Sequence, residues 1–248
     1  MILRRVIAHF RKQEWTAIAI DFVIVVVGVF VGLQVSNAND VRKDRVRETV
    51  FLSALARDVR SDIEEIDEII RVSTLRLSAM RYLIETASGA PMPQSLSSAR
   101  GEIVLEDAPA YDPDDAKTIG VAMFILTTLD GNRLAYDSMI NTGAIGVVRD
   151  DALLTRIQAY YGSVDTALIF EQSLEVNRTR LVDAQQTAGL SPVDAMPADE
   201  IVARFADDPG LLAAARNYAL YTNRHLKIMR ALREEAERLA ATLDGTRQ

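Results

Sequence analysis

The chain has 248 residues, a net charge of −7 and no cysteine, which excludes disulfides, thiolate metal ligands and a cysteine nucleophile. This length suffices for one medium domain with a sizeable core, and a second large domain is not expected. The first 21 residues hold four basic and two acidic side chains, which leaves 24 basic and 33 acidic residues, a net charge of about −9, for the remainder. Such an acidic domain repels nucleic acid and anionic lipid, so we expect no nucleic-acid partner.

Residues 15–35 form an almost uninterrupted apolar run, WTAIAIDFVIVVVGVFVGLQV, that follows a basic tail over residues 1–14. At about 1.5 Å per residue, a helix of this length crosses the hydrocarbon core of a bilayer. The sequence therefore predicts a single-pass transmembrane helix, with residues 36–248 as one domain outside the membrane.

The predicted topology places the short basic tail in the cytoplasm of a bacterial cell and the acidic domain in the periplasm. Basic residues are nearly equal in number on the two sides of the span, but a long domain translocates largely regardless of its charge. A cleaved signal peptide is the alternative, because Ser36-Asn37-Ala38 has the small-x-small pattern of a cleavage site. The charge inside the run favours a retained anchor in the inner membrane.

One face of the predicted span carries its small and polar residues: Asp21, Gly28, Gly32 and Ser36. Small residues let helix backbones approach closely, and an ionisable group in hydrocarbon needs a partner or water. This pattern predicts a helix-association face, either for a second copy of the chain or for another membrane protein. The alternative is that Asp21 reaches the membrane interface and that the glycine spacing has no function.

The rest of the chain has helical periodicity. Apolar residues recur at helical spacing from residue 37 to 88, a loop rich in proline, glycine and serine covers 89–112, and a second helix is expected from about 113 to 141. A third helix follows the N-cap residue Asp150 and ends near Gly189, and a short helix or turn comes before Asp208-Pro209.

The last helix has the clearest apolar stripe, with alternating steps of three and four residues: Leu211, Ala215, Tyr218, Thr222, His225, Met229, Leu232, Ala236, Leu239 and Leu243. Such a heptad seam is typical of coiled-coil packing. The expected fold class is all-α, an antiparallel bundle of about four long helices behind the transmembrane helix.

Glu171 and Arg178 on the third helix and His225 on the last are predicted to face inward and could line a polar ligand pocket. An internal ion pair is the alternative interpretation. The sequence has no nucleophile elbow, phosphate loop, dinucleotide fingerprint or histidine metal motif, so we expect no catalytic residues, no cofactor, no metal site and no enzymatic activity.

The end of the apolar run resembles a family of bacterial membrane-anchored proteins of unknown function, whose span ends in a Gln-x-x-Asn-Trp-Asn-like signature. Gln34, Asn37 and Asn39 match this pattern, and Ala38 replaces the tryptophan. The resemblance implies an anchor with a helical domain and no particular activity. The expected function is that of a non-enzymatic interaction or accessory protein, and a periplasmic small-molecule sensor that signals through a partner is the alternative.

Overall fold

The computed structural model describes residues 15–99, 101–112, 114, 119–191 and 196–245. The chain divides into two compact units, Met1–Val50 and Phe51–Gln248. Helix α2 (Trp15–Ser88) contributes to both units, and each unit is described by itself.

In the first unit, α2 includes the whole predicted span, which confirms that residues 15–35 are helical. The large apolar side chains from Ile20 to Val35 are between 48% and 68% exposed. No described part of the chain buries them, and by length and composition this helix can cross a membrane. An exposed apolar surface of this size is typical of a segment that contacts a membrane or a protein partner.

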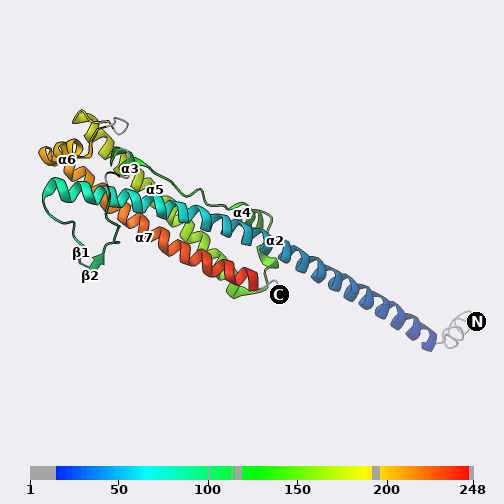
Figure 1. Cartoon of the computed structure of the whole chain (residues 1–248). Helices are drawn as coiled ribbons and strands as arrows, with labels where there is room; N and C mark the ends of the chain where they lie inside the picture. Colours follow the sequence, from blue (N-terminus) through cyan, green and yellow to red (C-terminus); the bar gives the residue numbers. More distant parts are fainter. Residues whose placement is uncertain (1–14, 100, 113, 115–118, 192–195, 246–248) are drawn as a thin grey trace, which may run out of the picture. The chain divides into compact units, whose positions relative to one another are not determined.

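The second unit is built on three long helices, namely α2 from Phe51 onward, α5 (Asp151–Thr187) and α7 (Pro209–Gly245) (Figure 1). The shorter elements are the hairpin β1 (Ser95–Ser98) and β2 (Gly101–Val104), helices α3 (Ile119–Phe124), α4 (Leu134–Asn141) and α6 (Ala198–Asp207), and the 3₁₀ turn η1 (Ala144–Val147). Most of the described residues are helical and the hairpin is the one sheet among them, which confirms the all-α fold class at that level.

The order of contacts along the helices sets their directions. Arg60 of α2 pairs with Asp244 of α7, and Asp67, further along α2, pairs with Arg233, which comes earlier in α7. These two helices are therefore antiparallel. Helix α5 is also antiparallel to α7, because Arg156 contacts Thr242 while Glu171 contacts His225. Helices α2 and α5 are consequently parallel to each other, unlike neighbours in the antiparallel bundle that we predicted.

The prediction of a long helix from about 113 to 141 is wrong. Its first turn lies mostly outside the described residues, and between α3 and α4 the segment 125–133 is not helical. Gly131 has a φ of +67°, which interrupts a right-handed helix. Backbone amides of this segment and of the start of α4 donate to carboxylates of the long helices: Ala135 to Asp58 (2.9 Å), Asn132 to Asp62 (2.8 Å), Asp130 to Glu65 (2.7 Å) and Leu129 to Glu171 (3.1 Å).

These four hydrogen bonds explain how the parallel arrangement is possible. Charge-assisted hydrogen bonds to carboxylates replace the intrahelical bonds that the amides of Leu129, Asp130 and Asn132 would make in a helix. Asp58, Asp62 and Glu65 have spacings of four and three residues, which put them on one face of α2. The connection from α2 to α5 can therefore run back along this acidic face instead of forming a fourth long helix.

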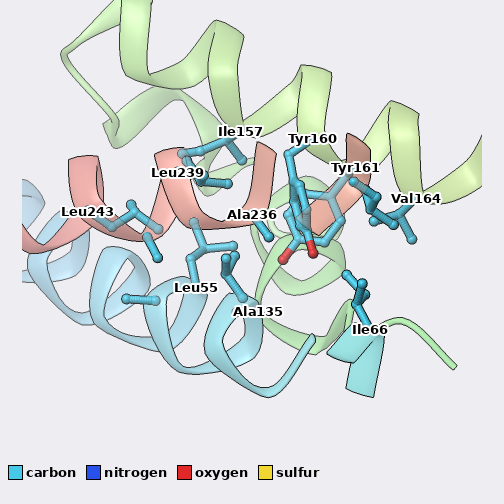
Figure 2. Close-up of a cluster of buried hydrophobic side chains, with 14 of the residues drawn as sticks. Leu55, Ile66, Ala135, Ile157, Tyr160, Tyr161, Val164, Ala236, Leu239 and Leu243 are labelled. Atoms are coloured by element: carbon cyan, nitrogen blue, oxygen red, sulfur yellow. The ribbon is translucent and has the colours of Figure 1, made fainter. Parts of the chain in front are cut away.

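Other local predictions are confirmed. The Asp150 side chain caps α5 by accepting hydrogen bonds from the amides of Ala152 and Leu153, and Asp208 does the same for Gly210 and Leu211 at α7. All ten residues of the predicted stripe on α7 are buried. Figure 2 shows part of the resulting core, a cluster that includes Leu55, Ile157, Leu239, Tyr160 and Tyr161.

Candidate functional site

A layer of buried polar side chains interrupts the apolar core of the bundle. One apolar cluster reaches Ile69, Ala167 and Met229 on the three long helices, and a second begins at Ala79, Leu174 and Ala219. Between them lies a set that we call the polar layer: Ser73 and Arg76 of α2, Glu171 of α5, and Thr222 and His225 of α7. Each of the three long helices thus contributes a polar side chain at the same level of the bundle.

The structure brings together Glu171 and His225, two of the three residues of the predicted pocket. The Nε2 atom of His225 lies 2.9 Å from Oε1 of Glu171, and its Nδ1 atom lies 3.3 Å from Oγ of Ser73. The two side chains are only 0% and 7% exposed. A neutral imidazole with its proton on Nε2 satisfies this network, because it donates to the carboxylate and accepts from the Ser73 hydroxyl.

Arg76 and Ser73 are members of the layer that were not predicted from the sequence, and Arg76 is the only charged one of the two. Its guanidinium donates to Thr222 Oγ1 (3.3 Å), to the carbonyl oxygen of Ile125 (3.0 Å) and to Ser73 Oγ (3.1 Å). Burial lowers the pKa of this guanidinium, while Tyr218 and Glu171 act in the opposite direction. The sequence did indicate that these two residues face inward. Positions 73 and 76 continue the spacing of three and four residues between the apolar residues Ile69 and Met80 of α2.

Arg178 does not join the other two residues of the predicted pocket. It pairs with Glu175 of its own helix, with Nε to Oε2 at 2.8 Å and Nη2 to Oε1 at 2.6 Å, and remains 31% exposed. The buried stripe of α5 steps from Leu174 to Asn177, which leaves Arg178 one position off the inward face. The cation near Glu171 is therefore Arg76.

The polar layer resembles a catalytic triad in its connectivity, because a serine, a histidine and a carboxylate are linked in series. Ser73 is nevertheless fully buried, and its Oγ also accepts a hydrogen bond from Arg76. A nucleophile must be able to reach its substrate, so this arrangement has the geometry of a structural network. Among the described residues, no group of three or more histidine or acidic side chains is placed to hold a metal ion.

The predicted association face lies wholly on the surface of the first unit. Asp21, Gly28, Gly32 and Ser36 are exposed. A Cβ atom added at either glycine would meet no atom within 4 Å. The described part of the chain therefore leaves room along this face for the backbone of another helix.

Asp62 of the acidic face also has an unusual environment. Its Oδ2 accepts a hydrogen bond of 2.7 Å from the Tyr160 hydroxyl, in addition to the amide bond to Oδ1. Burial raises the pKa of Asp62 above 3.8, as do Glu65 and Asp58, against the lowering effect of the two hydrogen bonds. The folded state therefore binds this proton more tightly than the unfolded chain does, and the contribution of Asp62 to stability falls as the pH rises through its folded pKa.

We predict that Asp62→Asn gains stability relative to the natural protein as the pH rises from about 4 to 7, because an amide stays neutral and keeps both hydrogen-bond partners. Urea unfolding of the full-length protein in mild detergent, followed by circular dichroism, would measure this trend. Asp199→Asn on α6 is the control, since Asp199 is exposed. A difference between Asp62→Asn and the natural protein that is the same at both pH values would contradict the prediction.

In comparisons with known proteins, a family model described as a family of unknown function (DUF6090) matches residues 21–87. The match covers most of α2, including most of the apolar run. No curated protein matches the chain. No solved structure does so either.

Proposed function

We propose that this chain is a non-enzymatic, membrane-anchored interaction or accessory protein that assembles through its apolar helix. The observation that carries the proposal is the exposed face with Asp21, Gly28, Gly32 and Ser36, where both glycines are open to close approach. Small residues at this spacing favour tight helix pairing in lipid, where apolar burial alone gives no driving force. The partner is a second copy of this chain or another membrane protein.

The acidic bundle is proposed to lie in the periplasm of a bacterial cell, with the basic tail in the cytoplasm and the anchor in the inner membrane. The tail holds four basic side chains, and short basic segments stay on the cytoplasmic side. This proposal includes that residues 15–35 stay in the mature protein as an anchor and are not removed as a signal peptide.

The test is to replace both glycines by isoleucine in the full-length protein, crosslink gently in the native membrane and purify in mild detergent. The matched control is Val23→Ile with Val26→Ile, which changes side chains on the opposite side of the same helix. We expect the natural protein and the control to purify as a complex of defined mass, and the double glycine variant to lose its partner. Mass spectrometry of the complex would identify that partner.

Complexes that are unchanged in Gly28→Ile with Gly32→Ile would contradict an association face at these residues. Complexes that are lost equally in the valine control would show that the helix responds to bulk on any side, which also removes the support for this face.

A further inference from the structure

A groove runs along the bundle surface between the β1–β2 hairpin and α7. It consists of two adjoining cavities of about 310 and 440 Å³, which share the lining residues Leu96, Leu105, Leu220 and Asn223. Volumes in this range are typical of sites for small organic ligands. The groove lies outside the polar layer and belongs to the second unit alone.

The lining of the groove is mostly apolar and open to solvent. Leu96 and Ile103 are directly opposite each other on the two strands of the hairpin, and Ile103 is 44% exposed. Phe170 and Tyr221, whose ring centroids lie 5.9 Å apart, add aromatic surface from α5 and α7. This groove is therefore suited to an apolar chain.

The hairpin side of the groove is held in place by hydrogen bonds. Asn223 of α7 accepts from the backbone amide of Glu106 at 3.1 Å and donates to its carbonyl oxygen at 2.8 Å. Glu106 also pairs with Arg230 through its carboxylate. These contacts fix the chain just after β2 against α7, so a ligand would not have to order this wall of the groove on binding.

Three basic side chains of α7 line the groove: Arg216 one cavity, and Arg224 and Lys227 the other. Nearby arginines of the same helix are paired, for example Arg233 with Asp67. Within the described ranges, by contrast, no carboxylate forms an ion pair with any of the three groove cations. In a domain with a net charge of about −9, these cations are available to a ligand with a negative charge.

We propose that this groove binds a long-chain carboxylate, an anionic amphiphile with one apolar chain. The chain would lie along Leu96, Ile103, Leu220 and Phe170, and the carboxylate would pair with Arg224 and Lys227. The two adjoining cavities accommodate an extended chain better than a compact ligand. This site does not depend on the association face of the first unit, and the two can fail independently.

The test uses the full-length protein in nanodiscs of zwitterionic lipid and a long-chain fatty acid that carries a diazirine in its chain. After photolysis, peptide mapping should find adducts on residues 96–105 and 216–227. Labelling of residues 15–35 serves as an internal standard, because a membrane-embedded probe reaches that helix without any site. A probe with the same chain and an alcohol headgroup should label the groove several-fold less.

The charge requirement is tested by Arg224→Glu with Lys227→Glu, which should reduce groove labelling about tenfold while labelling of the span is unchanged. Arg180→Glu on the exposed side of α5 is the control and should have no effect. Groove adducts that are absent, or that are equal for the alcohol probe and the charge-reversal variant, would overturn the proposal. Crosslinking of a photoreactive residue at position 103 to a second polypeptide, without competition by the fatty acid, would assign the groove to a protein partner and also overturn it.

Discussion

Arg76→Ala is expected to lower the free energy of unfolding of the bundle by about 3–5 kcal/mol, the usual loss when one member of a buried charged network is removed. The substitution leaves the Ile125 carbonyl oxygen and the Thr222 and Ser73 hydroxyls without their donor. It also leaves the buried carboxylate of Glu171 without the nearby cation. A cavity in a fully buried site adds to the loss.

Urea unfolding of the full-length protein in mild detergent, followed by circular dichroism, would measure the loss. Arg71→Ala is the matched control, because Arg71 lies on the same helix, is exposed and, among the described residues, pairs with Glu68 of its own helix. The control should change stability by less than about 1 kcal/mol. Arg76→Met retains most of the side-chain volume, so a loss close to that of Arg76→Ala would assign the effect to charge and hydrogen bonds. Stability unchanged in both variants would contradict the structural role of Arg76.

Val25→Arg combined with Val26→Arg is expected to release the protein from the membrane. Each arginine at the centre of a spanning helix costs about 2.5–3.5 kcal/mol on insertion, so two cost about 5–7 kcal/mol. Both valines are exposed in the described chain, so the variant has no reason to disturb the bundle core. The fraction that stays in the pellet after an alkaline wash of the membranes would measure the effect.

Val46→Arg with Val50→Arg is the control, because these valines are also exposed on the same helix but lie beyond the apolar run. This control should remain in the membrane pellet. A double variant at positions 25 and 26 that also remains there would show that residues 15–35 do not anchor the protein through the hydrocarbon core.

Some features followed from the sequence because their causes are local. The first residues of α5 and α7 follow from Asp150 and Asp208, whose side chains accept hydrogen bonds from the amides two and three residues later. The buried face of α7 follows from helical spacing alone, since side chains three and four residues apart share a face. The span at 15–35 can be recognised from its residue types alone, because a helix that crosses a bilayer needs a continuous run of apolar residues.

Other features depend on partners that are distant in the sequence. The segment 125–133 lies between two helices, yet its amides bind carboxylates that lie 42 to 70 residues away in the sequence. Those bonds hold the connecting segment along α2, as a parallel arrangement of α2 and α5 requires. The local sequence does not identify which carboxylate will bind a given amide, because any carboxylate on a helix surface can accept an amide hydrogen bond.

The candidate ligand pocket shows most clearly which features follow from the sequence and which depend on the tertiary structure. The sequence by itself determined that Glu171 and His225 face inward, because each lies on a regular apolar stripe of a long helix. Only the tertiary structure decided that Arg76 and not Arg178 accompanies them, since a shift of one residue moves a side chain about 100° around a helix. Burial of a charge is settled by the three-dimensional set of groups that can satisfy it, and here that set comes from α2, α5, α7 and the backbone of the connecting segment.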